Sequence, residues 1–96
     1  MIDSQGRFRI VLACDGVPTD VGPLAAVNIT EEFTRRPWHQ DVACMWDGQS
    51  LILQAENNFD PEGLALMDEF SDAISACIHE GFDGDIRIVA VTELTG

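Results

Sequence analysis

The chain has 96 residues, 46% of them hydrophobic, and its 17 acidic residues outweigh five basic ones, for a formal net charge of -12. A chain of this length has room for one core, and its hydrophobic fraction is typical of a folded protein, so residues 1–96 are expected to form a single domain. Binding to phosphates needs clustered basic residues, and here the basic residues are five arginines and no lysine. This composition argues against direct binding to nucleic acid and to anionic membrane surfaces.

Cysteine usage and the first residues point to the cytoplasm. The three cysteines, Cys14, Cys44 and Cys77, are an odd number and widely spaced, unlike the disulfide framework of a small secreted protein. Residues 1–5 lack the basic and apolar segments of a signal peptide. No apolar run approaches the roughly 20 residues that cross a bilayer. We therefore expect a cytoplasmic protein with no membrane span.

The first half of the chain shows the two-residue period of β-strands. Residues 7–14 alternate, with Phe8 and Ile10 on one side and arginines on the other, which predicts a strand. Residues 25–34 resume the alternation and favour a second strand. A short helix is the alternative there, because Asn28 or Thr30 could cap it.

A hairpin is predicted over residues 41–56. Two alternating apolar runs, 41–46 and 50–56, flank Asp47-Gly48-Gln49. Asp-Gly is the preferred chemistry of a tight turn between strands, because glycine accepts the positive φ that such turns require.

A single amphipathic helix is expected next. Asp60-Pro61 suits an N-cap and a first-turn proline, and Gly81 suits a terminator after His79 or Glu80. Apolar residues recur every three or four positions and predict the buried stripe. That stripe comprises Leu64, Met67, Phe70, Ile74, Cys77 and Ile78.

The last element is a strand over residues 86–94 that is apolar on both sides in its middle, which predicts an interior position in the sheet. The expected class is therefore α+β, with a mainly antiparallel sheet of four to five strands in the order β-β-β-β-α-β and one helix on one face.

One helix covers only one face of a sheet, so the other face should keep apolar side chains exposed. Large exposed apolar patches usually mark interaction surfaces, which predicts a homodimer through the sheet face or a second protein bound there. The alternatives are that the loop over residues 16–24 covers this face or that the sheet curls on itself. The residues expected on the face are Val11, Ala13, Met45, Ile52, Val89 and Val91.

The densest polar and aromatic cluster is the loop that contains Arg35, Arg36, Trp38 and His39. Two guanidinium groups can bind a carboxylate or phosphate, the indole offers a platform, and Asp41 could orient the imidazole. This loop is the candidate site of a small ligand-binding domain or enzyme. The competing interpretation is a structural turn. In it, the tryptophan covers the core and the arginines pair with acidic groups on the protein's own surface.

Other chemistry has weaker support. His79, Glu80, Asp83 and Asp85 lack the order of a calcium loop, and no Cys-x-x-Cys pair suggests zinc, so we expect no metal and no cofactor. Among the cysteines, only Cys14 lies at a strand end where a nucleophile could be accessible. No residue stands out as catalytic, and the sequence favours a non-enzymatic role.

Asp68, Glu69 and Asp72 form an acidic strip on the predicted helix. Such a strip is usually just a solvated face, but with no lysine nearby its field is of one sign and would steer basic partners. The favoured function is an acidic interaction module that binds or inhibits a basic protein.

Overall fold

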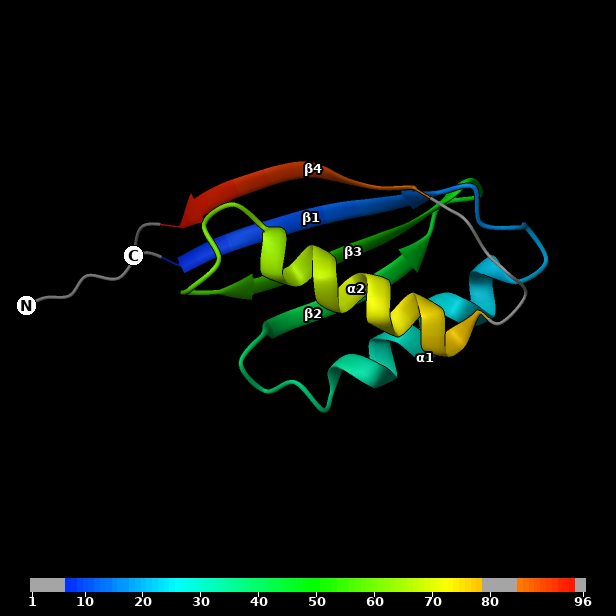
Figure 1. Ribbon diagram of the computed structural model, residues 1–96, viewed down its shortest axis with the longest axis horizontal. Coiled ribbons are helices and arrows are strands. Elements are labelled where there is room, and N and C mark those ends of the chain that lie inside the picture. Colours follow the sequence, from blue (N-terminus) through cyan, green and yellow to red (C-terminus); the bar gives the residue numbers. More distant parts are fainter. Residues whose placement is uncertain (1–6, 79–84, 95–96) are drawn as a thin grey trace, which may run out of the picture.

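The computed structural model describes residues 7–78 and 85–94, which form a four-stranded sheet and two helices (Figure 1). The strand order is β2-β3-β1-β4, and all neighbouring strands are antiparallel. Each helix therefore connects two parallel strands that are separated by a third, which is the split β-α-β or ferredoxin-like arrangement. The elements in chain order are β1 (Arg7–Asp15), α1 (Gly22–Phe33), β2 (Gln40–Trp46), β3 (Ser50–Asn57), α2 (Leu64–Cys77) and β4 (Asp85–Leu94).

The α+β class and the antiparallel sheet are confirmed, but the expected order β-β-β-β-α-β with one helix is wrong. Residues 25–34 fall mainly in α1, which begins at Gly22 with Pro23 in its first turn, well before Asn28 or Thr30. The buried residues of α1 recur at helical spacing. They are Gly22, Ala25, Ala26, Ile29 and Phe33. The alternation of larger side chains is therefore incidental, and Val27, the first of them, is 59% exposed.

The backbone of α1 at Gly22 packs closely against the Trp46 ring of β2. A Cβ atom added at Gly22 would lie 2.3 Å from Cδ2 of Trp46. Farther along α1, the Thr30 hydroxyl donates to the Ala26 carbonyl at 2.8 Å and accepts from the Cys44 N–H of β2 at 3.2 Å. Helix α1 is thus fastened to β2 at two points.

The first contact predicts that Gly22→Ala destabilises the protein, although alanine normally favours a helix. The methyl group must displace the Trp46 indole, an overpacking that typically costs about 1–3 kcal/mol. Urea unfolding measures the change, with Leu24→Ala, an exposed position on the same helix, as the control. A stabilised G22A variant would contradict the contact.

The hairpin is confirmed, with β2 and β3 joined by Asp47, Gly48 and Gln49. Gly48 has φ of 99°, in the left-handed region. The Asp47 carboxylate accepts the Ser50 N–H at 2.7 Å and the Gln49 N–H at 2.8 Å. These hydrogen bonds stabilise the charged carboxylate and lower its pKa below the ordinary value.

The lowered pKa fixes the sign of an acid effect. The stabilisation by Asp47 is complete above the unfolded pKa of about 3.9 and is lost as the pH falls through the lower, folded pKa. The difference in unfolding free energy between the wild type and Asp47→Asn should therefore shrink on acidification, as denaturant unfolding from about pH 6 to pH 2 would test. A constant difference would show that the carboxylate charge contributes nothing.

Helix α2 forms where predicted but begins later. The Asp60 carboxylate accepts the N–H groups of Ala65 and Leu66, at 3.2 and 2.9 Å, so this residue caps the helix across an intervening turn. Gly63, with φ of 77°, places that turn before the first helical residue, Leu64. Leu64 is 56% exposed and does not belong to the buried stripe. The expected end at His79 to Gly81 lies outside the described residues.

Strand β4 is confirmed as a strand, but its expected interior position is wrong because the sheet places it at an edge beside β1. Ile86 and Ile88 face the helices, opposite Cys14 and Leu12. The register shifts next to Val89, so the faces exchange there and apolar residues occur on both sides. The two-sided pattern comes from a bulge, not from burial.

Both helices lie on the same side of the sheet (Figure 1), and the core fills the space between them and the sheet. Neither α1 nor α2, the two helices of the described residues, covers the other face. The cross-strand pairs Ala13 with Ile52 and Ile52 with Met45 place these residues on that open face together with Val11, as expected. Val91 is the exception, because it pairs with Ile10 and packs against the core.

Candidate functional site

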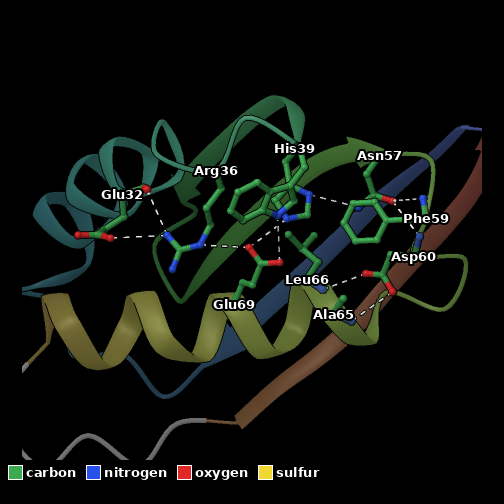
Figure 2. Close-up of polar contacts among 10 residues, drawn as sticks. Glu32, Arg36, His39, Asn57, Phe59, Asp60, Ala65, Leu66 and Glu69 are labelled. Atoms are coloured by element: carbon green, nitrogen blue, oxygen red, sulfur yellow. Dashed lines mark hydrogen bonds and ion pairs between the residues drawn. The ribbon is translucent and has the colours of Figure 1, made fainter.

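The predicted ligand loop and the predicted acidic strip meet at one carboxylate, that of Glu69 in α2 (Figure 2). Its Oε1 forms an ion pair with Arg36 Nε at 3.1 Å and lies 3.2 Å from His39 Nε2. Its Oε2 accepts from Trp38 Nε1 at 3.3 Å. Three side chains of the loop between α1 and β2 are thus held against α2.

His39 lies at the centre of this cluster with none of its side chain exposed. Its Nδ1 is 3.2 Å from Nδ2 of Asn57, at the end of β3. Asn57 Oδ1 accepts the N–H groups of Phe59 and Asp60, at 3.2 and 3.0 Å, which turns the amide nitrogen toward the imidazole. Nδ1 therefore accepts, and Nε2 carries the hydrogen and donates it to Glu69.

Aromatic rings surround the imidazole. The ring centroids of Phe33, Trp38 and Phe59 lie 5.8, 6.0 and 5.7 Å from that of His39. Asp41, the residue expected to orient His39, is instead an exposed residue with φ of 50°. With both nitrogens engaged and no exposed surface, His39 ties α2 to the ends of two strands, and the geometry offers it no route to a substrate proton.

The two arginines of the loop also face the protein's own carboxylates. Arg36 donates to the Glu32 carbonyl at 3.2 Å, lies 3.6 Å from the Glu32 carboxylate and stacks 5.0 Å above the Phe33 ring. Arg35 is 79% exposed and lies 3.6 Å from Glu32. A cleft of about 370 Å³ opens beside these side chains, lined by Glu32, Arg35, Arg36, Trp38 and Glu69. Two carboxylates balance two guanidinium groups there, so the cleft has no excess charge for an anion.

The remaining strip residues point to solvent. Asp68 and Asp72 are exposed on α2, whereas Glu69 is engaged as described. Sequence reasoning found Asp60 as a cap but missed Asn57, which is also buried and organises the loop before α2. The polar pair Asn57-Asn58 shortly before Asp60-Pro61, between two apolar elements, was the sign in the sequence of an ordered capping loop.

The cysteines do not form a reactive site. Burial raises the pKa of Cys14 to about 11 and that of Cys44 to about 12, and it also raises the pKa of the partly exposed Cys77. A thiol in this state stays protonated at neutral pH, which does not suit a nucleophile.

Residues 7–78 and 85–94 contain neither of two other classes of site, a metal centre and a membrane-spanning helix. That part of the chain brings no three His, Cys, Asp or Glu side chains together as a metal site would require. His79, Glu80 and Asp83 of the candidate metal cluster lie outside it. It also holds no helix with the length and hydrophobicity needed to cross a membrane.

The fold and the cluster define a small α+β protein of split β-α-β architecture with a buried histidine at its centre. No protein family model matches the chain, and no curated protein is significantly similar to it. Because one fold serves many functions, the argument for this protein's function depends on its own surface.

The buried cluster predicts a large effect of His39→Ala on stability. The substitution leaves a cavity among three rings and removes partners from Glu69 and Asn57, which together cost about 3 kcal/mol. Trp38→Phe, which loses only an exposed hydrogen bond, should cost less than about 1 kcal/mol. Denaturant unfolding compares the two, and equal effects would place His39 outside the core network.

Proposed function

We propose that this protein is a non-enzymatic, acidic interaction module that binds a basic protein through its helical layer. The observation that carries the proposal is the distribution of charge. All five arginines of the chain contact carboxylates of the same chain, and within residues 7–78 and 85–94 these pairs involve only Asp15, Glu32, Glu56 and Glu69. The exposed carboxylates outside these pairs are left to act on the surroundings.

Exposed carboxylates lie on both helices. Glu31 is exposed on α1, and Asp68 and Asp72 are exposed on α2. Beside Glu31, a groove of about 290 Å³ lies between the helices, and Glu32 and Arg35, which form an ion pair, line it together with Asn28, Ala76 and Cys77. A field of one sign along a surface speeds the approach of a cationic partner and weakens with added salt.

The alternative function, a ligand site or enzyme that uses Arg35, Arg36, Trp38 and His39, has less support. Both His39 nitrogens are engaged, and the adjacent cleft is balanced in charge. The loop supports a structural role instead.

The test of the interaction module is a salt-dependent capture with matched variants. Immobilised wild type should retain a basic protein from an extract of the source cells, and the protein should elute at about 0.5 M salt, where screening is strong. Asp68→Asn/Asp72→Asn should weaken retention about tenfold, or ~1.4 kcal/mol. Asp20→Asn/Asp41→Asn removes two exposed carboxylates elsewhere and should leave retention nearly unchanged. The proposal would be contradicted if retention did not fall with added salt, or if both double variants lost retention equally.

We further propose that the protein is a homodimer through the open sheet face. Three of the five arginines, Arg7, Arg9 and Arg87, lie on this face, where Glu56 and Asp15 pair with them. Repulsion between two strongly acidic chains is weakest where their cations gather. Four strands of this length present roughly 600 Å², so two copies bury roughly 1,200 Å², the lower limit of stable interfaces.

The dimer predicts a specific sensitivity to charge on the open face. Met45 is 55% exposed there, and Met45→Glu should convert the dimer to monomer because it places two like charges in the interface. Val27→Glu, at a 59% exposed position on α1, adds the same charge on the opposite layer and should not. Light scattering at tens of micromolar decides, and a wild type with the mass of one chain refutes the dimer.

A further inference from the structure

The two edges of the sheet differ. Strand β2, at one edge, lies against α1, and the Thr30 hydroxyl accepts the Cys44 N–H of this strand. Strand β4, at the other edge, pairs in the described part of the chain with β1 alone. Its ten residues are mostly exposed, so the side turned away from β1 offers backbone donors and acceptors to a further strand.

Strand β4 lacks most features that protect natural edges. It is long and contains neither proline nor lysine, and Val89 and Ile88 are 49% and 38% exposed. Its protective features are the charged side chains of Asp85, Arg87 and Glu93 and the bulge at Val89, which separates Asp85–Ile88 from the later residues. The segment before the bulge is a regular, open edge of four residues.

A groove runs beside this open segment, between β4 and the first two turns of α2. Its volume is about 530 Å³. It is lined by Leu64, Ala65, Met67, Asp68, Ser71, Asp85 and Ile86. From β4 the lining includes Asp85 and Ile86, so the groove adjoins the open segment at its first two residues, and along α2 it extends ~10 Å, from Leu64 to Ser71.

The lining specifies the chemistry of an occupant. Leu64, Met67 and Ile86 supply apolar surface, and Asp68 and Asp85 take part in none of the ion pairs among the described residues. A long cationic side chain fits this combination of apolar surface and carboxylates, because its aliphatic stem packs on apolar groups while its charged head reaches a carboxylate. An acidic segment would meet these carboxylates and the field of a chain with net charge -12.

We propose that the open edge of β4 binds an extended basic segment of the protein partner as a fifth strand. Alternate residues of that segment are arginine or lysine, and their side chains point into the groove. The residues between them are β-branched, and their side chains point to the open face of the sheet. Backbone hydrogen bonds provide affinity, and the groove selects positive charge. This inference rests on the proposed function and specifies how the partner is held.

The test uses two synthetic peptides of equal charge. One alternates arginine and valine over seven residues, and the other has proline in place of each valine, which removes strand formation but keeps the charge. Calorimetry should show at least tenfold tighter binding of the first. Amide hydrogen exchange should slow in β4 when it binds and stay unchanged in β2.

Matched variants locate the site. Asp68→Asn/Asp85→Asn should reduce binding of the arginine-valine peptide at least tenfold, and Asp20→Asn/Asp41→Asn should not. Circular dichroism and thermal unfolding confirm that both variants are folded.

Three results would overturn the inference. Equal, salt-sensitive binding of both peptides without protection of β4 would leave an acidic binding module that adds no strand. Binding of neither peptide would also refute strand addition, and the capture experiment would then judge the proposed function separately. Protection, in the protein alone at the concentrations used, of the β4 amides that point away from β1 would assign the edge to a second copy of this chain.

Discussion

The structure depends on where the chain places its five arginines. Five arginines are the only Lys or Arg residues in a chain of net charge -12, and four of them pair with a carboxylate on another element of the fold, whereas Arg35 pairs with Glu32 at the same end of α1. Arg7 and Arg9 join β1 to β3 through Glu56, Arg87 joins β4 to β1 through Asp15, and Arg36 joins α1 to α2 through Glu69. Exposed ion pairs are individually weak. Their placement nevertheless leaves the helical layer with an excess of negative charge, from which the proposed function follows.

The second organising feature is the direction of the hydrogen bonds around His39. Asn57 caps the turn before α2 with its oxygen, and this leaves its nitrogen to face the imidazole. The imidazole in turn donates to Glu69, which also accepts from Trp38 and forms an ion pair with Arg36. Each group thus fixes the orientation of the next, so the loop between α1 and β2 is held in one arrangement. Residues that resemble a catalytic cluster in the sequence therefore form a structural joint.

Sequence reasoning succeeded where one period or turn chemistry was decisive. The strict alternation of residues 7–14, the Asp47-Gly48 turn and the Asp60-Pro61 start each led to an element that the structure contains. It failed for α1, because the pattern of residues 25–34 fits both the strand period and the helix period, and only tertiary packing decides between them. One such contact joins Gly22 to Trp46, which lies 24 residues later in the chain. It also missed the partners of His39, since Asn57 and Glu69 lie 18 and 30 residues away and no local pattern reports such contacts. The acidic strip and the loop were found separately, and their meeting at Glu69 belongs to the tertiary structure.

The central position of β1 has a consequence for how the chain folds. Ile10 pairs with Ala55 on one side and with Val91 on the other, so β1 is flanked by β4, which follows it by about 70 residues in the chain. Until β4 leaves the ribosome, one flank of β1 remains unpaired, and the closing of so long a loop makes this the slow step of sheet formation. A nascent chain therefore exposes an apolar template, and its many carboxylates, which repel those of neighbouring chains, protect it from aggregation during that interval.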